Sequence, residues 1–235
     1  MNHVKNHVRK HLQKLQKIKR EKYHPLIHKI HKKHKISKKT LFYVKEYGPH
    51  THVPRTIIKE SVKILLFASI ISSFGGLALE YIKEIFISII PLIILMPALN
   101  GMIGGYGSII SSRFSTMLHE GKIKKDISNN HELKRLFFEI LVISMLTTLI
   151  SIIVSFIVSY FTGYNFNISN SLKIFFIVIL DVLVLVTLLF FTSIAAGIHY
   201  FKKKEDPNNF LIPIATSVAD FGNMIILALL VVIFF

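Results

Sequence analysis

Five long apolar segments are the feature that most constrains how this 235-residue chain can fold. They cover residues 57–82, 85–112, 137–161, 174–200 and 210–235. Each is long enough to supply the ~20 residues with which a helix crosses a hydrocarbon core of ~30 Å. Within lipid the backbone must satisfy its own hydrogen bonds, which leaves helices as the suitable form. The sequence therefore predicts an all-α, polytopic membrane protein with five transmembrane helices.

Charge divides the chain into two regions. Residues 1–55 carry 16 Lys and Arg against two acids, whereas residues 56–235 carry 13 against 11, so the net charge of +16 is concentrated in the first region. We expect a basic, His/Lys-rich N-terminal arm over 1–55 and a transmembrane domain over 56–235. No apolar run precedes residue 56, so no cleavable signal peptide is expected. The absence of cysteine excludes disulfides and thiolate metal sites.

The distribution of Lys and Arg predicts the orientation of the chain. An arrangement with the N-terminus inside and the C-terminus outside places 27 of the 29 basic residues on the cytoplasmic side. Cytoplasmic loops are generally enriched in these residues. We therefore expect a multi-pass protein of the cell membrane with a cytoplasmic N-terminus.

The second apolar segment is rich in proline and glycine. Proline removes a helical donor and glycine permits non-helical dihedrals, so we expect a broken helix that exposes backbone groups to a cavity. The alternative is close helix packing through small residues. The interrupting residues are Pro91, Pro97, Gly101, Gly104, Gly105 and Gly107.

Asp220 is the only charged residue in the last apolar segment. A carboxylate at membrane depth costs about 2.5–3.5 kcal/mol on insertion scales, so such a group normally faces a cavity, an ion path or a partner. We expect Asp220 to meet a cation. The alternative is a structural carboxylate that caps a neighbouring helix.

Two spaced motifs resemble the signature of the MgtE-type divalent cation transporters, which include animal solute-carrier relatives. The first reads Pro97-Ala-Leu-x-Gly101, then Gly104, Ser112-Arg113-x-Ser115-Thr116 and Gly121. The second runs from Asp206-Pro207 through Pro213 and Thr216 to Asp220. The resemblance covers roughly residues 57–235.

This resemblance implies a magnesium channel or transporter whose pore lies between two five-helix units, lined by the second and fifth helices. Because one chain holds a single unit, it implies a homodimer. The aspartate that matches Asp220 is the family's central cation site. The family usually carries Gly-Asn where this chain has Gly104-Gly105, and Asn100, one turn earlier, is a candidate to supply the missing amide.

The chemistry of these residues suits Mg²⁺, which is hard and prefers oxygen ligands. Two Asp220 carboxylates across a two-fold axis would neutralise one divalent ion. The absence of cysteine, and of histidine away from the segment ends, argues against zinc or copper but not against Mn²⁺ or Co²⁺. The predicted site comprises Asp220, Thr216, Asn100, Gly104 and Gly105.

Two further acids are secondary candidates. Asp181 lies inside the fourth segment, where a bond to Asn, Ser or Thr of an adjacent helix competes with an ion or proton role. Glu139 lies near the cytoplasmic membrane face, where it either attracts cations or pairs with Lys134 or Arg135.

The N-terminal arm holds nine of the twelve histidines, among them His3, His7 and His11 at helical spacing. Contact with anionic lipid headgroups ranks first for it, nucleic acid second and metal binding third. Mg²⁺ uptake is the predicted function of the chain. The alternatives are exchange of Mg²⁺ for Na⁺ or H⁺, and a non-transporting anchor in which the arm is the working part. No enzyme motif is present, so no enzymatic activity is expected.

Overall fold

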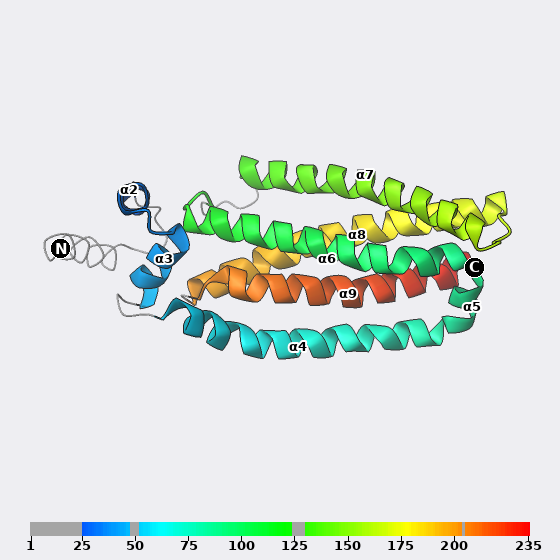
Figure 1. Cartoon of the computed structure of the whole chain (residues 1–235), viewed down its shortest axis with the longest axis horizontal. Coiled ribbons are helices and arrows are strands. Elements are labelled where there is room, and N and C mark those ends of the chain that lie inside the picture. The colour runs from blue at the N-terminus through cyan, green and yellow to red at the C-terminus, as the bar shows by residue number, and fades with distance from the viewer. Residues whose placement is uncertain (1–24, 48–51, 124–129, 204) are drawn as a thin grey trace, which may run out of the picture.

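The computed structural model describes residues 25–47, 52–123, 130–203 and 205–235, which form helices and no strand (Figure 1). The histidines at positions 3, 7 and 11 lie outside these ranges. The helices are α2 (Pro25–His34), α3 (Lys38–Tyr47), α4 (Val53–Tyr81), α5 (Lys83–Ser88), α6 (Ile90–His119), α7 (His131–Phe161), α8 (Ile168–Lys202) and α9 (Pro207–Phe234).

Five of these helices, α4, α6, α7, α8 and α9, are long and apolar enough to cross a membrane. The prediction of an all-α protein with five transmembrane helices is confirmed. The helices extend beyond the apolar segments because polar residues cap them. The Asn130 side chain accepts from the amides of Glu132 and Leu133 to begin α7, and Asn167 likewise begins α8.

The interruption expected within the second apolar segment lies near its start. Ile89 separates α5 from α6, just before Pro91, which occupies the first turn of α6. From Ile90 to His119 the helix is continuous and contains Pro97. The expectation of a break at the inner prolines and glycines is therefore not met. A single proline removes one backbone hydrogen bond, and the rest of this 30-residue helix is retained.

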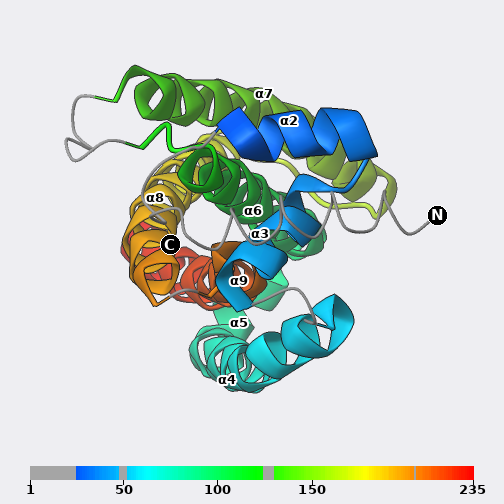
Figure 2. The same ribbon diagram turned by 90° about the vertical axis from the view of Figure 1, so that its left-hand side faces the viewer.

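Helix α9 occupies the centre of the bundle, in contact with α4, α6 and α8 (Figure 2). Helix α7 packs on α6 and α8, on the side away from α4. Half of the most apolar stretch of α8 is buried, against 11% of the corresponding stretch of α4. The core therefore lies among α6, α8 and α9, while α4 is a peripheral helix that rests on α9.

Small residues allow α4 to approach α9. The buried residues of α4 are Ala68 and Gly75, seven positions apart and hence on one face of the helix. A Cβ at Gly75 would lie 3.2 Å from the Cα of Phe221 and 2.7 Å from the Sδ of Met224. This contact places the middle of α4 beside the part of α9 that carries Asp220.

Candidate functional site

Asp220 lies at the middle of the central helix. It is 13 residues after Pro207 and 14 before Phe234, and its side chain is half-buried. The Ser72 hydroxyl of α4 donates to its Oδ2 at 3.3 Å. Ser72 was not among the predicted site residues, although a hydroxyl group inside an apolar segment could have suggested it. The carboxylate thus keeps both partial exposure and free acceptor capacity, as a cation ligand requires.

Thr216 lies one turn before Asp220 on α9 and faces Gly104 of α6. A Cβ at Gly104 would stand 3.9 Å from the Thr216 Cγ2. The Thr216 hydroxyl donates to the carbonyls of Ile212 and Pro213, each at 3.0 Å. Its proton is therefore used within the helix, and its oxygen is left to act as an acceptor toward a cation.

Asn100 is joined to Asn223, a residue that the sequence analysis did not assign to the site. The Asn223 Nδ2 donates to the Asn100 Oδ1 across the α6–α9 contact. Asn223 is fully buried and Asn100 only partly so. The amide oxygen expected to compensate at the cation site instead receives this bond, so Asn100 acts first as a link between the two helices.

Gly105 has a different environment from its neighbour Gly104. Gly105 and Gly101 are exposed, with no atom within 4 Å of a Cβ placed on either, whereas Gly104 is buried. Since residues four apart share a helix face, Gly101 and Gly105 leave one side of α6 open to close approach. The structure therefore separates the Gly104-Gly105 pair, with one residue against α9 and one on the open face.

Asp181 lies apart from these groups. Its side chain is 0% exposed on α8, and neither of its oxygen atoms has a hydrogen-bond partner within the described ranges. Of the two alternatives for Asp181, the bond to an Asn, Ser or Thr of an adjacent helix is therefore not formed in this structure. The chain packs apolar groups around it, since Val178, Val182 and Leu185 on the same helix are equally buried.

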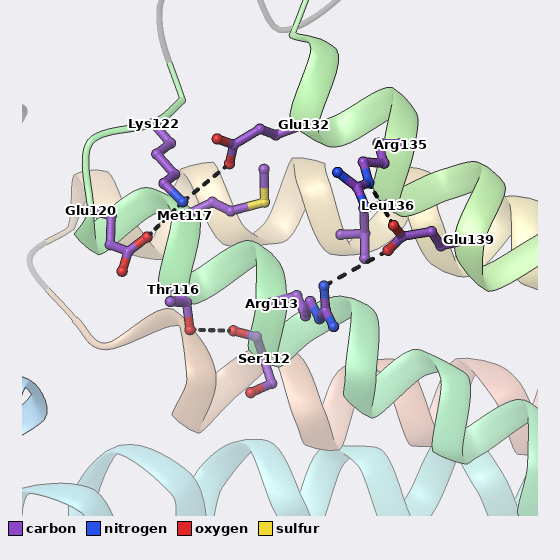
Figure 3. A pocket seen from close by; sticks show the side chains of 10 residues that line it. All are labelled: Ser112, Arg113, Thr116, Met117, Glu120, Lys122, Glu132, Arg135, Leu136 and Glu139. Carbon is purple, nitrogen blue, oxygen red and sulfur yellow. Dashed lines mark hydrogen bonds and ion pairs between the residues drawn. The ribbon is translucent and has the colours of Figure 1, made fainter.

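Glu139 belongs to a charged pocket of about 560 Å³ between the end of α6 and the start of α7 (Figure 3). Its Oε1 accepts from Arg135 at 2.7 Å, and its Oε2 lies 3.8 Å from Arg113. Lys122 pairs with Glu120 and Glu132 in the same pocket. The pairing with Arg135 anticipated from the sequence is confirmed. Glu139 is thus neutralised by arginine instead of being a free cation ligand.

The second motif begins with residues that anchor the start of α9. The Asp206 side chain caps the helix by accepting from the Asn208 amide at 3.1 Å, and it also accepts from the Tyr43 hydroxyl at 3.1 Å. Asn209 donates to the Tyr43 hydroxyl at 2.6 Å and to Glu60 Oε2 at 2.8 Å. This network joins α3 and α4 to the central helix α9.

Tyr43→Phe is expected to loosen α3 from α9. Burial, together with the nearby carboxylates of Asp206 and Glu60, raises the pKa of Tyr43 above its ordinary value, so the hydroxyl stays protonated and donates at neutral pH. Its loss removes two hydrogen bonds and costs about 1–3 kcal/mol. Amide exchange in α3 should accelerate, whereas Tyr81→Phe, at an 86% exposed position, should change nothing. Equal exchange in both variants would contradict the anchoring role.

The candidate site is sparse in cation ligands. No group of three or more His, Asp or Glu side chains suited to a metal occurs among the described residues. The chain instead offers one half-buried carboxylate at the middle of α9, with a threonine oxygen one turn away. Such a sparse set of oxygen ligands suits a hydrated ion better than a stripped one.

Five helices that are long and apolar enough to cross a membrane, one of which carries a carboxylate at its middle, define a multi-pass helical membrane protein. The family model MgtE, described as a divalent cation transporter, matches residues 96–230, which is more than half of the chain and includes every predicted site residue. The chain belongs to this family. Because it is a family of transporters, the prediction that the chain is not an enzyme is confirmed.

The curated relatives include solute carrier family 41 member 2 from Homo sapiens and from Macaca fascicularis. Each is 29% identical to this chain over 186 residues, covering 74% of the chain and 32% of the relative. The chain therefore spans about a third of the length of these relatives. No solved structure matches it.

Proposed function

We propose that this protein carries divalent cations, with Mg²⁺ as the principal substrate, across the cell membrane. The observation that carries the proposal is Asp220, a half-buried carboxylate at the centre of the central helix, in a family of divalent cation transporters. Carboxylate and hydroxyl oxygens are the ligands that Mg²⁺ prefers, and Asp220 and Thr216 supply both one turn apart.

We infer that two chains form the pathway together. One Asp220 balances only half the charge of a divalent ion, whereas two across a two-fold axis balance it fully. The open face of α6 at Gly101 and Gly105 supports this arrangement, since small residues permit close approach of helices in membranes. The pore would then run along α6 and α9, with Asp220 of both chains at its middle.

We assign the direction of transport as uptake. A membrane potential that is negative inside favours inward movement of a divalent ion by about 4.6 kcal/mol per 100 mV. The proposed orientation places the N-terminus in the cytoplasm. The basic arm over 1–55 would lie against anionic lipid headgroups on that side. A channel needs no further energy source, while an exchanger would require a Na⁺ or H⁺ gradient.

Flux of Mg²⁺ into proteoliposomes tests the proposal. Purified protein is reconstituted around a trapped Mg²⁺ indicator, and Mg²⁺ is added outside at an imposed negative internal potential. We expect uptake that persists without a Na⁺ gradient and exceeds that of empty liposomes. Removal of residues 1–24, which keeps α3 and Tyr43 in place, should leave the flux intact. No flux in the full chain would overturn the proposal and favour the non-transporting anchor.

A further inference from the structure

Asp181 is a buried acid that the proposed cation path does not use. Its side chain is 0% exposed, and both carboxyl oxygens lack a hydrogen-bond partner within the described ranges. It lies on α8, which packs against α6, α7 and α9. Burial of an isolated ionised carboxylate is far more costly than burial of a neutral polar group. An ionised Asp181 would therefore need a positive charge close to it.

The surrounding helices provide no such charge. The sequence contains no Lys or Arg in residues 90–112 of α6, 140–161 of α7, 174–201 of α8 or 207–234 of α9. An ion pair of Asp181 with a Lys or Arg from within these stretches is thus excluded by composition, and the Lys and Arg residues of these helices lie outside them. The carboxyl group must hold a proton or a small cation from solution.

Contacts between α6 and α8 fix the depth of Asp181 in the bundle. Ser111 of α6 and Ser193 of α8 lie 3.3 Å apart, and these two helices run in the same direction. Twelve residues earlier on each helix, Asp181 stands level with Leu99, because both helices rise 1.5 Å per residue. The Asn100–Asn223 bond is at the next position. Asp181 therefore shares a layer with this buried amide pair.

A proton fits this layer better than a metal ion. The buried side-chain oxygens without partners in the layer are the two of Asp181 and the Oδ1 of Asn223. Asp181 and Asn223 are both 0% exposed, so bulk water cannot complete the six ligands that Mg²⁺ takes or the six to eight that Ca²⁺ takes, as it can at the half-buried Asp220. A protonated Asp181 needs only one acceptor for its O–H, and Asn223 Oδ1 is a buried acceptor that lacks a donor.

Few other titratable groups face this layer. On α6 the nearest is Tyr106, whose hydroxyl bonds to Thr147 of α7, and on α7 itself Tyr160 lies at the far end. On α9 the only one is Asp220, three residues from Asn223. Asp220 bonds to Ser72 of α4. Among the residues of α9, Asp220 is therefore the ionisable group available to respond to a charge on Asp181.

We propose that Asp181 is a proton-binding site and that its proton and the divalent cation at Asp220 bind antagonistically. The inference rests on the proposed function. Two positive charges repel across a poorly screened protein interior, and such coupling is reciprocal. When the cation arrives, the Asp181 O–H bond breaks, the proton passes to bulk water and the carboxylate remains.

Infrared difference spectroscopy and a pH-indicator dye test this coupling on the purified full chain in lipid nanodiscs. Addition of MgCl₂ should decrease the protonated-carboxyl C=O band and release up to about one proton per chain. In Asp181→Asn the Asp181 part of both signals should vanish. Mg²⁺ affinity should fall about tenfold there, since the amide cannot become negative, in line with typical coupling between two sites. Glu84→Gln, which removes an exposed carboxyl group, should behave as the wild type.

The outcomes separate this inference from the proposed function. Mg²⁺ binding by the wild type without any change in the carboxyl band would overturn the inference, whether or not the Asp181→Asn variant folds. Full retention of both signals in folded Asp181→Asn would overturn it as well. An Mg²⁺ affinity unchanged in Asp220→Asn would instead contradict the proposed cation site, because the antagonism requires a cation at Asp220.

Discussion

Replacement of Asp220 by Asn is expected to reduce Mg²⁺ flux into proteoliposomes about 100-fold, the equivalent of roughly 3 kcal/mol of lost cation stabilisation. The amide keeps the size of the side chain and can still accept from Ser72, so the α4–α9 contact should persist. What it removes is the negative charge. In the proposed dimer the substitution removes both charges that balance one divalent ion, which explains the large effect.

Two variants serve as controls for this result. Asp220→Glu retains the charge but moves it by one methylene, so flux should fall less than in Asp220→Asn. Ser72→Ala removes a single hydrogen bond to Oδ2 and should alter flux only a few-fold. If Asp220→Asn were folded and carried Mg²⁺ at the wild-type rate, Asp220 would not be the cation site.

The apolar segments and the two motifs made the fold and family predictable. Segments of 25 or more residues leave little choice of secondary structure in lipid. Asp220 was identifiable because one charge in an otherwise apolar helix is costly. The packing partners could not be predicted in this way, because they depend on which faces of two helices distant in sequence meet. The bond of Asn223 to Asn100 and that of Ser72 to Asp220 join residues 123 and 148 positions apart.

One local expectation was wrong and one open alternative was not realised, both for physical reasons. Pro97 does not break α6, since the helix tolerates one missing hydrogen bond and breaks at Ile89 instead. Asp181 does not bond to a neighbouring polar side chain, although Asn223 lies in the same layer. The sequence places Asp181 and Asn223 in apolar helices, but it contains no information about how these two helices are rotated relative to each other. The partner of Glu139 was easier to predict, because Arg135 lies four residues away on the same helix.

Gly197→Ala is expected to destabilise the bundle by about 1–3 kcal/mol, the usual cost of overpacking a well-packed core. A Cβ at Gly197 would lie 2.5 Å from Cε1 and 2.7 Å from Cδ1 of Phe114, and 3.2 Å from Cδ1 of Leu211. Phe114 is fully buried on α6, so its ring has little room to move. The added methyl group would push α8 away from α6 and α9 together.

Gly76→Ala is the matched control, because it adds the same methyl group to α4, where nothing lies within 4 Å of the new Cβ. Its intrinsic helix preference should raise stability by up to about 1 kcal/mol. Thermal unfolding of both variants in detergent, followed by far-UV circular dichroism, makes the comparison. The melting temperature should fall for Gly197→Ala and hold or rise for Gly76→Ala. Equal melting temperatures would mean that α6 and α8 do not pack as closely at Phe114 as described, since that contact alone distinguishes the two sites.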